Sequence, residues 1–289
     1  MFVFNRGLIA SLTRKLSMAK ERWDLSIMLT FPCILVIGLL VRFIVWALNL
    51  DLNLVDMPLI SRKGVLNRYF AGHSFEIFAL QFSIITAYLL LYKSDAIKYS
   101  DSTSLLPVTE RDLRTSTTRR HVLLKQTLKL ALIFSWITIL IVWFFGDSIF
   151  EWFLKLTGGK CSNGNKALKY HECLADDGNR WVGGVKLSGH SLILSCFSTV
   201  LVFELLIIRK VHLRNRLERI LNTQRSLSSI AYKIILLMVT TLVSIWVFMF
   251  AVTAVFYHTV PEKIVGLTCG LLPSYLFYFR FKEYFDILA

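Results

Sequence analysis

The stretch YKIILLMVTTLVSIWVFMFAVTAVF, residues 232–256, decides the fold of this chain. It contains a single charged side chain, Lys233, and it is longer than the roughly 20 apolar residues that a helix needs to cross about 30 Å of hydrocarbon. Uninterrupted apolar runs of this length rarely occur by chance. We therefore expect residues 232–256 to form a transmembrane helix.

The rest of the chain has the same character. Of its 289 residues, 55% are hydrophobic and 13% are aromatic, and the mean hydropathy is +0.58. This composition excludes disordered, collagen-like and nucleic-acid-binding chains. Five more apolar stretches occur, at residues 25–50, 75–92, 124–145, 188–208 and 264–279. The sequence predicts an all-α, polytopic membrane protein with six transmembrane helices, of which the second and the sixth are the weakest.

The net charge of +14 indicates how these helices are oriented. With the N-terminus in the cytosol, the cytosolic segments hold 19 Lys and Arg and the segments on the other side hold 10. Because cytosolic loops carry the excess of Lys and Arg, we expect both termini in the cytosol.

The predicted domain organisation follows from this orientation. Residues 1–24 form a basic, partly amphipathic cytosolic arm, and residues 25–289 form a single six-helix membrane domain. This domain has a lumenal loop at 146–187 and a basic cytosolic loop at 209–230. The basic loop either attracts anionic lipid headgroups or serves only to fix the topology.

The chain contains five cysteines, of which two lie outside the apolar stretches. Cys161 and Cys173 are twelve residues apart in the predicted lumenal loop, where a disulfide and two free thiols both remain open. Cys33, Cys196 and Cys269 lie in apolar runs and are interpreted as packing residues. The sequence contains no metal-ligand spacing, and we expect neither a metal nor another cofactor.

The histidines cluster on one side of the predicted membrane. His121 and His212 lie among cytosolic Arg and Lys and are interpreted as solvated surface. The other four fall on the lumenal side, namely His73, His171, His190 and His258. An imidazole is well suited to proton transfer or phosphoryl acceptance near neutral pH, and this clustering therefore indicates chemistry.

Two of these histidines have informative neighbours. In WVGGVKLSGHS, residues 181–191, a Gly-rich turn opens the fourth helix at His190, with Ser188 as its N-cap and a phosphate donor. The helix N-terminus there is a site for anions. In FYHTVPEK, residues 256–263, His258 ends the fifth helix, and Glu262 is placed to orient its ring. Because the two helices run in opposite directions, His190 and His258 reach the same depth.

These two blocks resemble known families. Ser188-Gly189-His190 looks like the second signature of the lipid phosphate phosphatase superfamily, and His258 with Glu262 resembles its third. The two blocks together, with a weaker echo at residues 67–70, resemble the fat storage-inducing transmembrane protein family, in particular its fungal-type members, along nearly the whole chain.

The resemblance implies a multi-pass endoplasmic reticulum protein whose active site faces the lumen. It implies an acyl-CoA diphosphatase that hydrolyses fatty acyl-CoA to acyl-4′-phosphopantetheine and adenosine 3′,5′-bisphosphate. This activity would support lipid droplet biogenesis, phospholipid biosynthesis and lipid homeostasis. By the superfamily's chemistry, His258 is the nucleophile, His190 the general acid and Ser188 a phosphate ligand. Membrane lipids, including diacylglycerol or triacylglycerol, are the other expected partners, and no nucleic acid is expected.

The chain also departs from the superfamily pattern. Where the superfamily has an Arg six residues before its nucleophilic His, this chain has Val252. The phosphate charge must then be met by other cations. The candidates are Lys186, Arg180, Lys263 and Arg42, the last of which lies in the lumenal third of the first helix. His73, in a second Gly-His-Ser, is interpreted as a coincidence or an interface marker.

A few intramembrane residues have structural interpretations. We expect Glu204 to pair with Lys233 or Arg209, and Pro32 and Pro273 to kink their helices. Three alternative functions stay open: a noncatalytic scaffold that binds neutral lipid during lipid droplet budding, a lipid phosphate phosphatase of other substrate range, and a proton-coupled transporter. The transporter is disfavoured because the sequence shows no evident inverted repeat.

Overall fold

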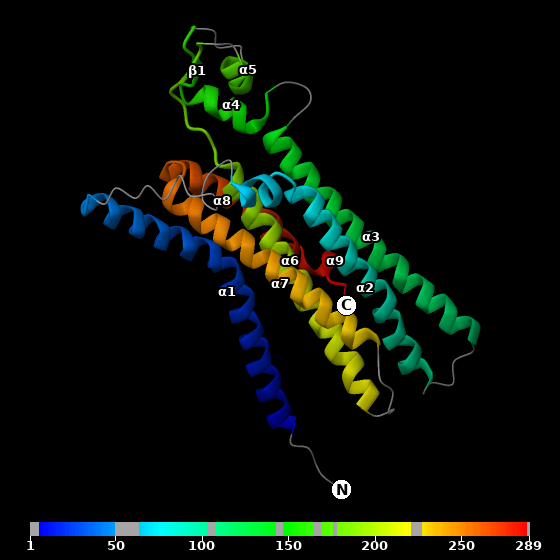
Figure 1. Ribbon diagram of the computed structural model, residues 1–289. Helices are drawn as coiled ribbons and strands as arrows, with labels where there is room; N and C mark the ends of the chain where they lie inside the picture. The colour runs from blue at the N-terminus through cyan, green and yellow to red at the C-terminus, as the bar shows by residue number, and fades with distance from the viewer. Residues whose placement is uncertain are drawn as a thin grey trace.

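The computed structural model describes residues 6–49, 64–102, 108–142, 147–163, 169–175, 178–220 and 227–287. Helices make up most of this part of the chain (Figure 1). The elements are α1 (Arg6–Ala47), η2 (Asn67–Ala71), α2 (Ser74–Ser102), α3 (Val108–Ile141), α4 (Ile149–Leu156), β1 (Lys160–Cys161), α5 (Tyr170–Ala175), β2 (Trp181–Val182), α6 (Gly189–Ile220), α7 (Leu227–Phe256), α8 (Val260–Tyr275), η3 (Leu276–Arg280) and α9 (Lys282–Phe285). The elements η2 and η3 are π-helical turns.

Five of the helices are long and apolar enough to cross a membrane. Their candidate spans are Asp24–Ala47, Ser74–Tyr92, Arg119–Ile141, Gly189–Leu213 and Ser229–Phe256. These spans overlap the first five predicted stretches, and the polytopic, mostly helical class is confirmed. The sixth stretch, predicted at 264–279, lies in α8 and η3, where α8 alone has 16 residues.

The first helix continues directly from the predicted cytosolic arm. The described part of the arm is helical from Arg6 onward and belongs to α1, which runs without a break to Ala47. Pro32 lies inside α1, and the helix is visibly bent in Figure 1. Large apolar side chains such as Phe43 and Trp46 are exposed on α1, as expected of a helix that faces lipid.

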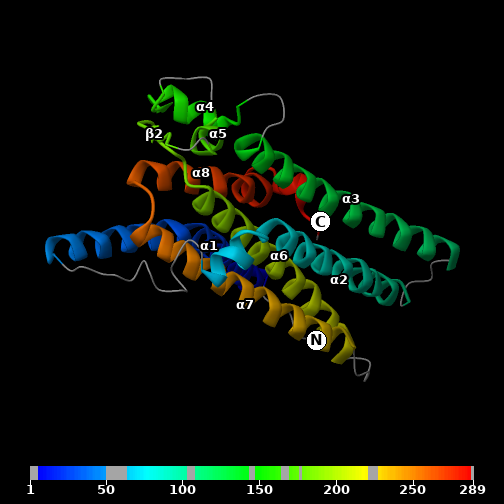
Figure 2. The same cartoon turned by 45° about the horizontal axis from the view of Figure 1, so that its top comes forward.

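Helix α6 forms the centre of the bundle and contacts α8, α7 and α2 (Figures 1 and 2). In an 18-residue window of its candidate span 78% of the residues are buried, against 17% in the corresponding window of α1. Phe197 of α6 stacks on Phe78 of α2 with ring centroids 4.2 Å apart, and the buried Trp246 of α7 lies beside it. Aromatic packing therefore fixes α2 and α7 around the central helix.

Helix α8 approaches the start of α6 closely because two glycines face it. A Cβ atom at Gly266 would lie 2.5 Å from the Ser188 carbonyl oxygen, and one at Gly270 would lie 2.1 Å from the Ser195 Oγ. Small residues allow helix backbones to approach in this way within membranes. The contact holds the middle of α8 against the start of α6.

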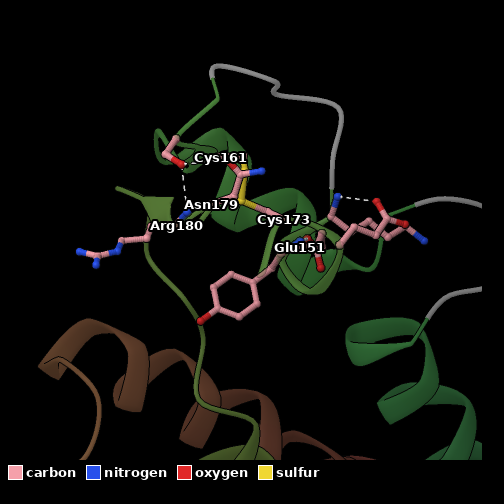
Figure 3. The surroundings of a disulfide bond; sticks show 9 residues. Glu151, Cys161, Cys173, Asn179 and Arg180 are labelled. Carbon is pink, nitrogen blue, oxygen red and sulfur yellow. Dashed lines mark hydrogen bonds between the residues drawn. A yellow bond between two sulfur atoms is a disulfide. The ribbon is translucent and has the colours of Figure 1, made fainter. Parts of the chain in front are cut away.

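The loop predicted at 146–187 has its own small fold, which we call the cap; the structure describes it at 147–163, 169–175 and 178–187. It contains α4, α5 and the antiparallel pair β1–β2. Cys161 and Cys173 form a disulfide with a Cα–Cα distance of 5.7 Å, and both are fully buried (Figure 3). The cap lies at the end of the bundle where α6 begins and α7 ends, here called the histidine end (Figures 1 and 2).

Much of the segment at 209–230, predicted as a basic cytosolic loop, is helical. Helix α6 continues to Ile220 and α7 starts at Leu227, while residues 221–226 lie outside the described part.

The prediction that Glu204 pairs with Lys233 or Arg209 is wrong. Its carboxylate is fully buried and accepts hydrogen bonds from Lys129 (2.6 Å), Gln126 (2.7 Å) and the hydroxyl of Tyr278 (2.6 Å), whereas Lys233 and Arg209 are exposed. A buried carboxylate requires hydrogen-bond donors in the interior, and α3 and η3 supply them.

Two further interpretations need correction. His212 is buried rather than solvated, because its ring stacks on Tyr232 at 4.2 Å and its Nδ1 lies 3.4 Å from the Tyr88 hydroxyl. Cys33 is exposed on α1 rather than packed, whereas Cys196 is fully buried in the core. His121 is exposed, as predicted.

Candidate active site

Glycines shape the segment that precedes α6, and a serine caps this helix. Gly183 and Gly184 have φ angles of +73° and +76°, a region that glycine adopts without steric cost. Ser188 is fully buried, and its Oγ accepts the backbone N–H of Ser191 at 3.2 Å, as an N-cap does. The hydroxyl of Ser188 thus faces the helix end, where it also accepts a hydrogen bond from the Ser191 hydroxyl at 3.0 Å.

His258 lies in the tight connection between α7 and α8. Its φ angle is +61°, which is uncommon for a residue other than glycine and costs free energy that neighbouring contacts must offset. Directly after it, Thr259 and Glu262 form a capping box at the start of α8. The strained backbone of His258 is thereby held at the histidine end.

Glu262 connects the two blocks. Its Oε2 accepts the Thr259 backbone N–H at 2.8 Å and lies 3.2 Å from Nδ1 of His258, while its Oε1 accepts the Lys186 backbone N–H at 3.0 Å. The Glu262 carbonyl also accepts the Ser188 backbone N–H at 3.2 Å. One residue therefore orients the ring of His258 and joins α8 to the segment that precedes α6.

The electrostatics around Glu262 keep it ionised. Burial acts to raise its pKa, but the backbone N–H groups of Thr259 and Lys186, together with the His258 ring, hold the pKa below the ordinary value. An ionised carboxylate can only accept, so Nδ1 of His258 carries the hydrogen of this pair and the ring's lone pair lies on Nε2.

Both histidines line one cavity of about 270 Å³. The lining residues come from the start of η2 and the residue before it, from the start of α6 and the segment before it, and from the end of α7 and the connection after it: Leu66, Asn67, Lys186, Leu187, Gly189, His190, Phe248, Met249, Val252, Thr253, Tyr257 and His258. The antiparallel arrangement of α6 and α7 thus brings together the two imidazoles that lie 68 residues apart in the sequence. Val252, six residues before His258, also lines this cavity.

Asn67 is a site residue that the sequence prediction did not assign. Its Oδ1 lies 2.6 Å from Nε2 of His190, and because an amide oxygen only accepts, Nε2 carries the hydrogen. The π-helical turn η2 that begins at Asn67 is anchored where the indole N–H of Trp246 donates to the Phe70 carbonyl at 3.1 Å. The only sequence signal was the weak resemblance of residues 67–70 to the family pattern.

The four candidate cations occupy different places. Lys186 lines the cavity, and its Nζ lies 3.6 Å from the centre of the Tyr170 ring of the cap. Arg42 is exposed, and its Nη1 donates to the His258 carbonyl at 3.3 Å. Arg180 is exposed on the cap and points away from the disulfide (Figure 3).

Lys263 is the fourth candidate, and its ammonium group faces the protein interior. The side chain is fully buried, and Nζ donates to the Ala254 carbonyl at 2.5 Å. Burial and the nearby charge of Arg42 lower its pKa to about 8, although Glu262 acts in the opposite direction. Of the four, Lys186 lies in the cavity wall and Arg42 lies beside His258.

The remaining histidines on the same predicted side do not line this cavity. His73 is exposed and lies 3.8 Å from the carboxylate of Glu76, which is also exposed. His171 is exposed on the cap. In the described ranges, no group of three or more His, Cys, Asp or Glu is placed to hold a metal ion.

Comparisons with known proteins agree with these blocks. The profile of the family described as Fat storage-inducing transmembrane protein (FIT) matches residues 59–278. A Saccharomyces cerevisiae protein named acyl-coenzyme A diphosphatase is 24% identical over 270 residues, which cover 89% of this chain and 92% of that protein.

Two relatives match over shorter regions and carry the same name. The Schizosaccharomyces pombe protein is 30% identical over 156 residues, which cover 51% of this chain and 55% of the relative. The Danio rerio protein is 32% identical over 95 residues, which cover 33% of each chain. No solved structure matches the chain significantly.

Proposed function

Since the chain belongs to the Fat storage-inducing transmembrane protein (FIT) family, we propose that it is an acyl-CoA diphosphatase. It hydrolyses fatty acyl-CoA to acyl-4′-phosphopantetheine and adenosine 3′,5′-bisphosphate. The observation that carries this proposal is the shared cavity of His190 and His258, with the Glu262 carboxylate behind the second ring. This arrangement supplies a nucleophile, an acid and an orienting group to one substrate.

His258 acts as the nucleophile. With Nδ1–H held by Glu262, the Nε2 lone pair attacks one phosphorus of the diphosphate, and a phosphorus–nitrogen bond forms while the bridging phosphorus–oxygen bond breaks. The leaving group departs with the bridging oxygen. Water then attacks the phosphohistidine, which releases the second phosphate product and restores the ring.

His190 handles the proton. Its Nε2–H is engaged by Asn67, so that Nδ1 of the protonated ring is the atom that donates to the leaving oxygen and later accepts a proton from the attacking water. The leaving group is itself a phosphate, which requires less help from an acid than an alkoxide does. We therefore assign the larger share of catalysis to His258.

The negative charge of the diphosphate is met by individual groups rather than by a basic patch. Lys186 reaches the cavity from its wall, and Arg42 approaches from α1 beside His258. The N-terminus of α6 adds its backbone N–H groups. Because Ser188 is buried and caps α6, we assign it the positioning of this helix end rather than contact with phosphate.

We further propose that the chain crosses the endoplasmic reticulum membrane six times with both termini in the cytosol. The sixth crossing is formed by residues 264–279, which lie in α8 and η3 and begin directly after Lys263 at the histidine end. The charge distribution and the disulfide in the cap both support a lumenal histidine end, because disulfides persist in oxidising compartments. Support of lipid droplet formation and contact with diacylglycerol or triacylglycerol belong to the same proposal.

The decisive experiment is an assay of the purified protein with long-chain acyl-CoA and mass spectrometry of the products. We expect the parent to release adenosine 3′,5′-bisphosphate and His258→Ala to lose at least about 10³-fold in rate, as nucleophile removal usually does. His190→Ala should lose about 10²-fold.

His73→Ala is the matched control, because His73 has the same Gly-His-Ser context but lies outside the cavity. Its rate should equal that of the parent. A parent that releases no adenosine 3′,5′-bisphosphate, or two site variants that keep the parental rate, would contradict the proposal and favour a noncatalytic lipid-binding role.

A further inference from the structure

A second, open hollow of about 430 Å³ lies along α7 and shares lining residues with the histidine cavity. Leu66 and Phe248 line both hollows. The second hollow, here called the α7 groove, is lined by Leu66, Thr240, Thr241, Ser244, Ile245 and Phe248. All of these except Leu66 belong to the candidate span Ser229–Phe256, so the groove lies beside the cavity and runs along this helix.

The wall of the groove is less polar than its sequence suggests. Thr240 Oγ1 donates to the Leu236 carbonyl at 2.7 Å, and Ser244 Oγ donates to the Thr240 carbonyl at 2.8 Å. Hydroxyl groups that bond to their own helix need no partner from a ligand. What these side chains offer to the groove is mainly carbon, next to the ring of Phe248, which is 45% exposed.

We infer that the α7 groove holds the fatty acyl chain of the substrate. This inference rests on the proposed function, because it takes the diphosphate to lie at His190 and His258. The pantetheine arm leaves the cavity past Leu66 and Phe248, and the apolar end of the substrate then continues along α7. The groove runs with the helix that crosses the bilayer, and an acyl chain placed there lies in the direction of the surrounding lipid chains.

The length of the groove determines which acyl-chain lengths it can distinguish. From Phe248 to Thr240 a helix rises about 12 Å at about 1.5 Å per residue. An extended hydrocarbon chain, with C–C bonds of about 1.5 Å, advances about 1.3 Å per carbon, so the groove contacts about nine carbons. Acyl chains with more carbons extend past Thr240 into lipid, and the groove distinguishes short chains from long ones rather than among long ones.

The test places a bulky side chain in the groove and measures the acyl-chain profile. Ser244→Trp fills the middle of the groove. Leu237→Trp is the control, because Leu237 lies two turns away on the same exposed side of α7, is 68% exposed and does not line the groove. Release of adenosine 3′,5′-bisphosphate is measured for CoA esters from butyryl to oleoyl, and size-exclusion chromatography checks folding.

We expect Ser244→Trp to lower kcat/KM for palmitoyl-CoA and oleoyl-CoA about tenfold, within the range by which hydrophobic pockets discriminate. Butyryl-CoA should change less than about twofold, and Leu237→Trp should match the parent for all esters. Retained butyryl-CoA turnover, or an unchanged elution profile where that turnover is too slow, shows that Ser244→Trp is folded.

The other outcomes overturn the inference in distinct ways. An equal loss for all esters would assign the groove to the pantetheine arm, and no loss for any ester would assign it to bilayer lipid. In both cases the parent still releases adenosine 3′,5′-bisphosphate, and the proposed function stands. If the parent releases none from any ester, it is the proposed function that fails.

Discussion

Two glutamates, one in the middle of α6 and one at the histidine end, show how the same side chain serves different purposes. Glu204 is fully buried and receives hydrogen bonds from three side chains, those of Lys129, Gln126 and Tyr278. Glu262 receives two backbone N–H groups and the His258 ring, and the side chains of this pair keep 12% and 19% of their surface exposed.

The two carboxylates differ in whether a substrate can approach the groups that they contact. The charge of Glu204 is compensated by hydrogen-bond donors of α3 and η3, which are packed around it. Glu204 thereby fixes the position of these elements against α6. The carboxylate of Glu262 is anchored by the backbone, while its partner ring faces a cavity that a substrate can enter. A sealed pair fixes how the helices pack against each other, and an anchored pair beside a cavity can support chemistry.

Removal of Lys129 should produce the largest change. Lys129→Met leaves the Glu204 carboxylate buried without its counter-ion, and we expect the free energy of unfolding to fall by about 3–5 kcal/mol. Thermal unfolding in detergent measures this. The double variant Lys129→Met with Glu204→Leu removes both charges and should recover most of the loss. A single variant as stable as the parent would show that the Glu204 carboxylate does not need Lys129 as its counter-ion.

Glu262→Gln should change activity more than stability. The amide has one acceptor where the carboxylate has two, and its NH₂ group donates toward Nδ1 of His258, which moves the ring proton to Nε2 and removes the attacking lone pair. We expect kcat to fall about tenfold or more, which corresponds to at least about 1.4 kcal/mol of transition-state stabilisation, with little change in KM.

Glu76→Gln is the control for that variant. Glu76 also lies beside a histidine, His73, but both side chains are exposed and outside the cavity. Its activity should stay within about twofold of the parent. If both variants behave alike, the carboxylate behind His258 has no special role in catalysis.

The sequence predicts the parts of this molecule that depend on composition and on the alternating direction of consecutive helices. A bilayer requires long apolar helices, so hydropathy alone locates the five candidate spans. Because consecutive spans alternate in direction, His190 at the start of one and His258 at the end of the next meet at one end. The Glu262 contact follows from the four-residue spacing at a helix start.

The sequence does not predict contacts that depend on how helices rotate and pack against each other. Lys129 and Glu204 are 75 residues apart, and hydropathy gives no reason to prefer that pair over the neighbouring cations. Asn67 reaches His190 because Trp246 anchors the turn that begins at Asn67, which again depends on tertiary packing. His212 was misassigned for the same reason, because its basic neighbours in sequence do not show that Tyr232 covers its ring.

The last and smallest effect concerns the second buried lysine, Lys263. Lys129 has a carboxylate partner, whereas Lys263 donates to the Ala254 carbonyl and has Arg42 nearby, and its pKa is lowered from 10.5 to about 8. Between about pH 8 and 10.5 the unfolded chain binds a proton at this lysine that the folded chain does not, and the free energy of unfolding therefore rises with pH over this window.

Lys263→Met lacks this titration, so the melting temperature of the parent minus that of the variant should rise from pH 8 to pH 10. A gain of about 2–4 °C is expected, the shift that about 1 kcal/mol produces in a protein of this size. Other titrating groups cancel in the difference, since both proteins share them. A difference in melting temperature that does not change with pH would show that Lys263 stays protonated in the folded protein. Glu262 would then compensate the charge of Lys263 as Glu204 does for Lys129, and the two lysines would be more alike than their hydrogen bonds indicate.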